Sequence, residues 1–231
     1  MLTVDDLHVS YGAVEALRGL SMTCAAGRIT CVIGRNGVGK TTLLRSIMGI
    51  QAIDRGGIQL DGRQLGRLPA HARARAGLAL VPQGRQIFPK LTVEENLRVG
   101  LQARSDGRRR VPEEIYETFP ILKDFARRRG GDLSGGQQQQ LAIGRALAGD
   151  PSVLLLDEPT EGIQPNIIQA IGRVLRQLAD ERRMTVVLVE QYLDFVKEIG
   201  DSFHVINRGT VVASGATADL SEELVDQHLM V

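Results

Sequence analysis

The feature that most constrains the fold of this 231-residue chain is the segment Gly34-Arg35-Asn36-Gly37-Val38-Gly39-Lys40-Thr41, which fits G-x-x-x-x-G-K-[ST]. A buried strand is expected before it, over 28–33, and apolar residues at helical spacing follow between positions 43 and 48. Glycines in such a turn let backbone N–H groups face a phosphate at the start of the helix. The segment therefore predicts a strand–loop–helix unit that binds a nucleoside triphosphate.

The chemistry of this unit assigns a role to each polar residue type. Lys40 is expected to reach the β- and γ-phosphates of ATP, and the Thr41 hydroxyl is expected to ligate Mg²⁺. The other nucleotide-binding residues expected here are Gly34, Asn36, Gly37, Gly39 and Thr42. The alternative, a glycine-rich turn without a ligand, is disfavoured because both flanking elements are present.

A second pattern completes the predicted site. Residues 153–156 are apolar and are followed by Asp157 and Glu158, as in a strand buried on both faces that carries carboxylates at its carboxyl end. Asp157 would hold Mg²⁺, directly or through water. Glu158 would polarise the attacking water, and general-base assistance of this kind is worth roughly 10²–10⁴ in rate. An Asp-Glu pair after an apolar run is usually explained by helix capping. Here the phosphate loop in the same chain favours a catalytic role instead.

The pattern along the chain predicts an α/β fold with a parallel sheet and an antiparallel flank formed by the strand-rich start. Strands are expected over 2–9, 15–24, 28–33, 57–60, 78–81, 153–157, 185–189, 203–207 and 210–213, and helices from Lys40 to Gly49 and over 69–75, 92–101, 165–179, 191–199 and 217–229. We expect one domain, 1–231, with a core over about 1–85 and 151–231. Residues of about 86–150 show helical patterning without a convincing strand and predict an inserted helical lobe.

Composition limits the classes of binding partner and the cellular locations that we expect for this protein. The net charge is +1 and aromatic residues make up 3% of the chain, which gives no electrostatic or stacking reason to expect nucleic acid. No window approaches the roughly 18 apolar residues of a spanning helix, and the N-terminus carries acids where a signal peptide carries bases. We expect a soluble, cytoplasmic protein, which would have to dock on a separate integral partner if it works at a membrane. The basic runs 108–110 and 127–129 are read as a solvated face, with a docking or lipid-headgroup contact as the alternative.

A third motif carries a family resemblance. Leu133-Ser134-Gly135-Gly136-Gln137 resembles the signature motif of ABC ATPases, in the order and spacing that the family has relative to the first two motifs. Two glycines at a helix start, capped by Ser134, form a second anion-binding end. The resemblance implies a P-loop NTPase (RecA-like) core and a head-to-tail dimer. In that dimer ATP lies between the phosphate loop of one subunit and Ser134, Gly135, Gly136 and Gln137 of the other.

Two further positions match the family one at a time. Tyr11 matches the aromatic residue that stacks on adenine, with packing at a strand end as the open alternative. Gln83, within Val81-Pro82-Gln83-Gly84, matches the glutamine that touches Mg²⁺ and water and senses the transmembrane partner. The resemblance thus adds Gln83 both to the metal ligands and to the catalytic residues.

Two positions depart from the family pattern. Gln191 stands where most relatives have the switch histidine, and Gln164 stands where a loop usually ends in aspartate. A glutamine can hydrogen-bond a γ-phosphate but cannot carry a proton charge. We therefore expect Gln191 to act at the catalytic site. We also expect this chain to pair with a different ATPase subunit, although a homodimer stays open.

The finer resemblance concerns the solute. Val189-Glu190-Gln191 is similar to the branched-chain amino acid importer group, and the phrases at 84–89, 129–132 and 158–165 resemble its urea-transport branch. This implies an ATPase at the cytoplasmic face of the inner membrane, partnered by permeases and indirectly by a solute-binding protein. The alternatives are an importer of branched-chain amino acids or other small amides, a soluble ABC ATPase acting on nucleic acid or ribosomes, and a nucleotide switch that does not hydrolyse ATP.

Overall fold

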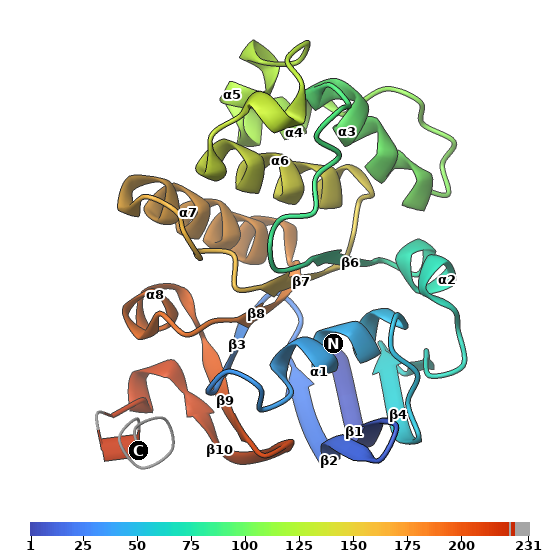
Figure 1. Cartoon of the computed structure of the whole chain (residues 1–231), viewed down its shortest axis with the longest axis vertical. Helices are drawn as coiled ribbons and strands as arrows, with labels where there is room; N and C mark the ends of the chain where they lie inside the picture. Colours follow the sequence, from blue (N-terminus) through green and yellow to red (C-terminus); the bar gives the residue numbers. More distant parts are fainter. Residues whose placement is uncertain (222, 225–231) are drawn as a thin grey trace.

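The computed structural model describes residues 1–221, 223 and 224, and its centre is a six-stranded sheet (Figure 1). The strand order is β10 (Thr210–Ala216), β9 (Ser202–Asn207), β3 (Ile29–Ile33), β8 (Thr185–Val189), β7 (Val153–Asp157) and β6 (Leu78–Val81). All neighbouring pairs are parallel except β10 with β9. The parallel sheet predicted from the sequence is therefore confirmed. The carboxyl ends of β3, β7 and β8 lie side by side.

The predicted antiparallel flank is also present. It is a sheet of β2 (Val14–Cys24), β1 (Leu2–Tyr11), β4 (Arg55–Leu60) and β5 (Arg63–Gln64), in that order. The apolar alternation of residues 2–9 slips once because the register shifts between Val4 and Leu7, and Asp6 adopts a left-handed φ of 44°. The short strand β5 was not predicted, since two exposed polar residues carry no pattern.

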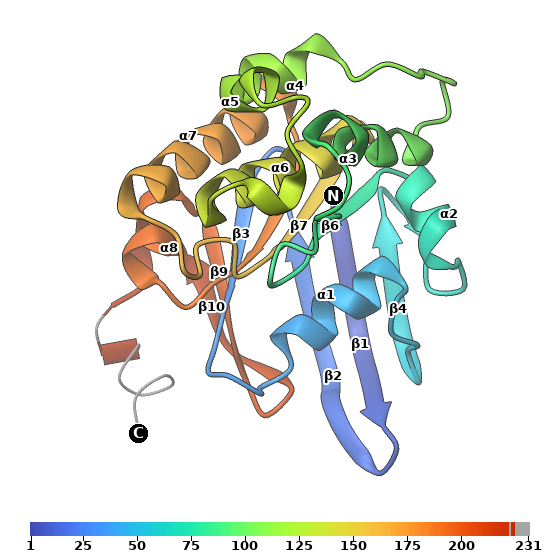
Figure 2. The same cartoon turned by 45° about the horizontal axis from the view of Figure 1, so that its top comes forward.

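Helices cover both faces of the parallel sheet. They are α1 (Lys40–Met48), α2 (Ala70–Arg75), α3 (Val93–Gly100), α4 (Glu113–Thr118), α5 (Pro120–Asp124), α6 (Gly135–Ala148), α7 (Pro165–Arg182) and α8 (Leu193–Ile199). Short 3₁₀ turns cover Leu101–Ala103, Gly130–Asp132 and Thr217–Asp219. Successive residues of β7 alternate between two cores: Leu155 packs with α1 and the antiparallel sheet, and Leu156 packs with α6, α7 and α8. Helix α1 thus lies between the two sheets (Figure 2).

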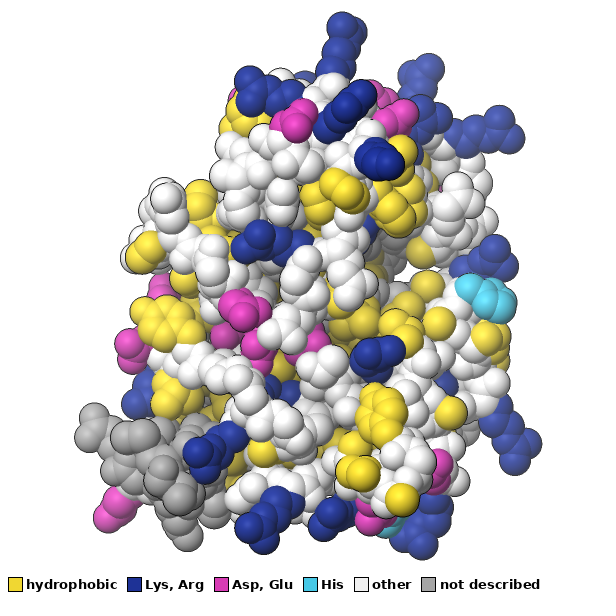
Figure 3. Space-filling model, in the orientation of Figure 1, with side chains coloured by type: hydrophobic (Ala, Val, Ile, Leu, Met, Phe, Trp, Pro, Cys, Tyr) yellow, Lys and Arg dark blue, Asp and Glu magenta, His cyan; other side chains and the backbone are white. Residues whose placement is uncertain are grey.

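The segment of about 86–150 contains α3 to α6 and no strand, only an isolated bridge between Thr92 and Arg129. These helices form the upper end of the molecule in Figure 1. The arginines at 108–110 and 127–129 are all exposed, and basic side chains are prominent on this end of the surface (Figure 3).

The predicted helix over 217–229 is wrong at its start. Strand β10 continues to Ala216, three residues beyond its predicted end, and the 3₁₀ turn Thr217–Asp219 follows. Residues 223 and 224 are helical, as predicted. Of the rest of that predicted helix, residues 222 and 225–229 lie outside the described residues. Within the described residues, no helix combines the length and the apolar character that crossing a bilayer requires.

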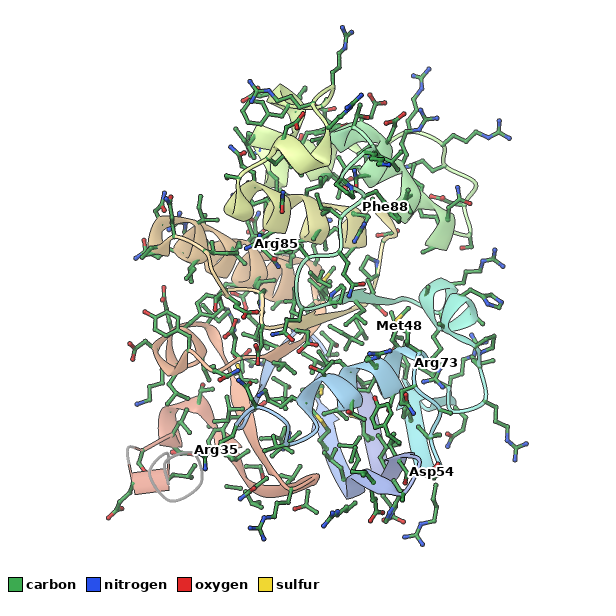
Figure 4. All side chains as sticks on the ribbon, viewed as in Figure 1. Arg35, Met48, Asp54, Arg73, Arg85 and Phe88 are labelled. Carbon is green, nitrogen blue, oxygen red and sulfur yellow. The ribbon has the colours of Figure 1, made fainter. Side chains whose placement is uncertain are left out.

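One buried arginine ties α1 to the chain that follows it. Arg73 of α2 is only 3% exposed, and it lies beside the C-terminal end of α1 (Figure 4). Its guanidinium donates to the carbonyls of Ser46 and Ile47 at 2.7 and 2.8 Å, and to those of Gly66 and Leu68 at 3.0 and 2.8 Å. A cation at this place satisfies terminal carbonyls and opposes the negative end of the helix dipole.

We predict that Arg73→Met lowers the free energy of unfolding by about 2–4 kcal/mol, because four carbonyls lose a charged donor in a buried place. Urea unfolding of the purified chain measures the effect. The control is Arg75→Met on the same helix, whose side chain is exposed and whose loss should change stability by less than about 0.5 kcal/mol. Equal stability of both variants would show that Arg73 does not hold α1.

Candidate functional site

The phosphate-binding segment connects β3 to α1 and requires glycine at defined places. Gly39 is the residue before α1 and has a left-handed φ of 111°. A Cβ at Gly39 would lie 2.8 Å from Leu17 Cδ2 and 2.9 Å from the Ala16 carbonyl oxygen. A Cβ at Gly34 would lie 2.5 Å from the Ile206 carbonyl oxygen. Glycine at these two positions therefore lets the loop pack closely against β2 and β9. The opposite side of the loop is left for a ligand.

Lys40, the first residue of α1, is only 5% exposed. Its ammonium group donates to the carbonyls of Gly34 at 2.7 Å and Arg35 at 3.0 Å. It also lies 3.5 Å from Glu158 Oε1. The loop thus wraps around its own lysine and holds that charge next to the carboxylate that follows β7.

Glu158 is the point at which separate parts of the chain meet. Its φ of 48° is left-handed, which is unusual for a glutamate, and its N–H donates to the Val189 carbonyl at 2.9 Å. Gln83 Nε2 donates to Glu158 Oε2 at 3.0 Å, and Gln191 Nε2 donates to Glu158 Oε1 at 2.6 Å. Gln191 Nε2 also donates to Asn36 Oδ1 at 2.7 Å. The structure therefore brings four predicted site residues, Lys40, Gln83, Glu158 and Gln191, into one cluster.

Asp157, the last residue of β7, has the surroundings that a hard cation prefers. It is 3% exposed, and its Oδ1 is buried without a hydrogen-bond partner. Burial raises the pKa of the Asp157 carboxyl, and a hydrogen bond with the Thr41 side chain partly opposes this shift. Mg²⁺ takes oxygen ligands such as a carboxylate and a hydroxyl, so Asp157 and Thr41 fit it. Gln83 donates through its nitrogen to Glu158 and Glu161, and its role as a metal ligand stays a prediction.

A cavity of about 480 Å³ lies over the phosphate loop, within the size range of small-molecule sites. It is lined by Tyr11, Val14, Ala16, Asn36, Gly37, Gly39, Lys40, Thr41, Thr42, Gln83 and Glu158. Tyr11 is 46% exposed, so part of its side chain is open to the cavity, and its contact with adenine stays a prediction. Val14 and Ala16 were missed by the sequence reasoning, because small and apolar residues in a strand carry no sign of a ligand.

The signature motif forms a capped helix start elsewhere in the fold. Ser134 precedes α6, and its hydroxyl accepts from the Gln137 N–H at 3.4 Å while Gln137 Oε1 accepts from the Ser134 N–H at 2.9 Å. The predicted polar cap at Ser134 is therefore present. Among the described residues, none of 134–137 lines the cavity over the phosphate loop. Their contact with a nucleotide stays a prediction that needs a second subunit.

Two acidic residues of this region were not predicted. Glu161 accepts from Gln83 at 3.0 Å, and Glu190 is a buried carboxylate, 2% exposed, after β8. A signal for Glu190 does exist, because Glu-Gln follows the apolar run 186–189 just as Asp-Glu follows the run 153–156. Which loops the Glu190 carboxylate contacts could not be read from that signal.

With this geometry, the comparison with known families decides the identity. A model of the ABC transporter family matches residues 17–161, a range that spans the phosphate loop, the signature helix and both carboxylates at the carboxyl end of β7. The chain belongs to the ABC transporter family. As an ABC ATP-binding chain it is an ATPase, and the fold and family expected from the three motifs are confirmed.

Relatives of this ABC protein resemble it over nearly its whole length. The chain is 40% identical to the high-affinity branched-chain amino acid transport ATP-binding protein BraG of Pseudomonas aeruginosa, with 99% of each chain covered. It is 36% identical to a probable branched-chain amino acid transport ATP-binding protein, LivF, of Archaeoglobus fulgidus, covering 96% of this chain and 94% of that one. It is also 33% identical to the lipopolysaccharide export ATP-binding protein LptB of Escherichia coli, covering 99% and 94%.

Solved ABC structures share the fold. A nucleotide-free ATP-binding cassette from an ABC transporter superposes with a TM-score of 0.83 at 27% identity, over 100% of this chain and 95% of that one. A dimeric cassette in a post-hydrolysis state, bound to ADP and phosphate, gives a TM-score of 0.85 at 25% identity, over 94% and 99%.

We predict that Lys40→Ala weakens ATP binding by about 10- to 100-fold, since a charged donor to the phosphates is worth roughly 1.5–3 kcal/mol. Titration calorimetry with ATP measures the affinity, and circular dichroism checks the fold. Lys197→Ala is the control, because Lys197 is exposed on α8. ATP affinity in Lys40→Ala equal to that of the wild type would remove Lys40 from the phosphate site.

Proposed function

We propose that this ABC ATPase is the motor subunit of a membrane importer and works at the cytoplasmic face of the membrane. The observation that carries the proposal is the cluster in which Glu158 lies 3.5 Å from the Lys40 ammonium and accepts from Gln83 and Gln191. This arrangement places a carboxylate, a cation and two amides at the carboxyl edge of the sheet. These are the groups that positioning a water against a terminal phosphate requires.

The residues act together in the proposed hydrolysis. Lys40 binds the β- and γ-phosphates and offsets their charge. Glu158 accepts the proton of the attacking water, while Gln83 and Gln191 hold its carboxylate in place. Asp157 and Thr41 would hold Mg²⁺, which would supply positive charge that offsets the charge of the phosphates. Tyr11 stacks on the adenine at the mouth of the cavity. A chain that binds ATP without hydrolysing it would not need a carboxylate where Glu158 stands.

A second subunit completes the site in this proposal. The Ser134–Gln137 helix start is the surface that contacts the γ-phosphate held by the opposite subunit. The segment of about 86–150 is proposed to act as the signature lobe, and residues 1–85 and 151–231 as the nucleotide-binding core. Support for dimers comes from the solved cassette that is dimeric with ADP and phosphate. Because Gln191 and Gln164 replace the usual histidine and aspartate, we infer a heterodimer with unequal sites.

The permease contact is proposed to lie in a groove between α1 and the helical segment. This groove has a volume of about 630 Å³ and is lined on one side by Met48 and Ile50 and on the other by Phe88 and Val99, and Figure 4 labels Met48 and Phe88 on its two sides. Hydrophobic side chains gather in this part of the surface (Figure 3). Ile50, Phe88 and Val99 are 51%, 45% and 38% exposed, which is costly unless a partner covers them.

The groove shares two lining residues with the nucleotide cavity. Thr41 and Gln83 line both, so a partner seated in the groove touches a residue that donates to Glu158. Arg45 and Arg145 add positive charge to the apolar lining. The occupant that fits is a short cytoplasmic helix of a permease with apolar and acidic side chains. A soluble ABC ATPase acting on nucleic acid or ribosomes would share the nucleotide site but does not account for this groove, and the relatives named above belong to transport systems.

The solute is proposed from resemblance, since no residue of this subunit would touch it. The phrases at 84–89, 129–132 and 158–165 favour urea. The relatives BraG and LivF, which are 40% and 36% identical, favour branched-chain amino acids. Both solutes imply a solute-binding protein and permease subunits. Uptake of radiolabelled urea and uptake of radiolabelled leucine, each measured with the reconstituted importer, would distinguish the two solutes.

We predict that Glu158→Gln retains ATP binding, loses turnover by about 10²–10⁴-fold and accumulates as a closed dimer in MgATP. Phosphate release and size-exclusion chromatography, each performed with the assembled subunit pair, measure the two effects. Glu198→Gln, an exposed change on α8, should leave both unchanged. Turnover of Glu158→Gln at the wild-type rate would exclude Glu158 as the base.

We predict that Ile50→Glu weakens association with the permeases by about tenfold or more, because the groove loses an apolar contact and gains a charge. The ATPase rate of the subunit pair without permeases should not change. Co-purification with co-expressed permease subunits measures the association. Val212→Glu is a matched control at an aliphatic residue that is 41% exposed on β10. Equal permease binding by both variants would place the contact elsewhere.

A further inference from the structure

A buried carboxylate beside the hydrolysis site has no part in the chemistry described above. Glu190 follows β8 and is only 2% exposed. Its N–H continues the sheet by donating to the Val32 carbonyl at 3.2 Å, so its backbone is fixed between β3 and β8. Burial raises the pKa of the Glu190 carboxyl, and four hydrogen bonds oppose this shift. A carboxyl group is costly to bury unless its oxygens are hydrogen-bonded, so the bonds that Glu190 makes explain its place.

The two oxygens of Glu190 serve two different loops. Oε1 accepts from the Thr160 N–H at 3.0 Å and from the Thr160 hydroxyl at 2.8 Å. Oε2 accepts from the Gln191 N–H at 3.0 Å and from the Tyr192 N–H at 3.4 Å. Thr160 belongs to the loop after β7, which begins with Glu158. Gln191 and Tyr192 belong to the loop after β8.

We propose that Glu190 is a positioning residue that holds the Glu158 loop and the Gln191 loop in one fixed relation. The proposal rests on the proposed function, because it matters for catalysis only if Glu158 and Gln191 act there. The Glu158 carboxylate accepts from the Gln191 side chain at 2.6 Å. Together with the two bonds from Thr160 and the bond from the Gln191 N–H, this contact closes a ring through Glu158, Thr160, Glu190 and Gln191. Movement of either loop would therefore displace the base from its amide partner.

The same bonds explain why glutamine cannot replace Glu190. An ionised carboxylate only accepts, whereas a glutamine side chain offers one accepting oxygen and one donating NH₂ group. In Glu190→Gln the oxygen can serve one loop, and the NH₂ group then faces the donors of the other. One of the two loops therefore loses its hydrogen bonds to residue 190, although glutamine has nearly the same size as glutamate. The phosphate loop, which Glu190 does not contact through its side chain, keeps its ligands.

The test combines kinetics with a readout that does not depend on activity. In the subunit pair, we expect Glu190→Gln to lower kcat for ATP by about 10- to 100-fold, as expected when a catalytic group shifts by about 1 Å, and to change KM by less than about threefold. Hydrogen–deuterium exchange of the purified chain should rise in the peptides 158–164 and 190–193 and stay unchanged in 34–48. Glu198→Gln on α8 is the matched control.

A second pair of variants covers the case in which Glu190→Gln does not fold. Thr160→Val removes only the hydroxyl that donates to Glu190, and Thr160→Ser restores it. We expect a lower kcat and faster exchange over 158–164 in Thr160→Val, with Thr160→Ser recovering most of the difference.

The outcomes are distinct from those of the proposed function. The positioning role of Glu190 would be overturned if hydrogen–deuterium exchange over 158–164 and 190–193 were unchanged in Glu190→Gln. A wild-type kcat in this variant would overturn it as well. Equal losses in Thr160→Val and Thr160→Ser would also overturn it, and so would exchange that rises evenly along the whole chain. Full turnover in Glu158→Gln would instead overturn the proposed role of the base, while the exchange experiment would still report whether Glu190 ties the loops.

Discussion

The structure depends on three parallel strands, β3, β7 and β8, ending at one edge. Their ladders are regular, with Val32 beside Val189 and Asp157 beside Val189, and each strand is buried along its length. Charged residues appear only where these strands end. The chain places there the phosphate loop, the Asp157–Glu158 pair and the Glu190–Gln191 pair. A rigid apolar sheet thus positions a small number of charges with little conformational freedom, as electrostatic catalysis requires.

Much of this could be predicted because the motifs are local. The motif from Gly34 to Thr41 identifies the phosphate loop, in which contacts with Ala16, Leu17 and Ile206 require glycine at positions 34 and 39. Four apolar residues before Asp157 identify a buried strand of the sheet. The capped start at Ser134 follows from residue types three positions apart. In each case the information lies within a few residues, so the physical argument does not need the tertiary fold.

What could not be predicted depends on contacts between distant segments. Glu190 bonds a residue thirty positions earlier, Gln83 reaches Glu158 across 75 positions, and Arg73 reaches the carbonyls of α1. The end of β10 was placed too early, because 214–216 are small or polar residues without an apolar pattern. Strand β5 was missed for a similar reason. Propensity is weak where pairing with a neighbouring strand decides the conformation.

The central claim is that ATP is held by Lys40 and Asp157 of one subunit and by the signature helix of another, with Glu158 facing the terminal phosphate. The most direct measurement is a crystal structure of the assembled subunits with Mg²⁺ and a non-hydrolysable ATP analogue. The account predicts the γ-phosphate within hydrogen-bond distance of Lys40 Nζ and of the opposite Ser134–Gln137 backbone, with the cation on Asp157 and Thr41. A nucleotide bound away from Lys40, or a Glu158 carboxylate distant from that phosphate, would contradict it.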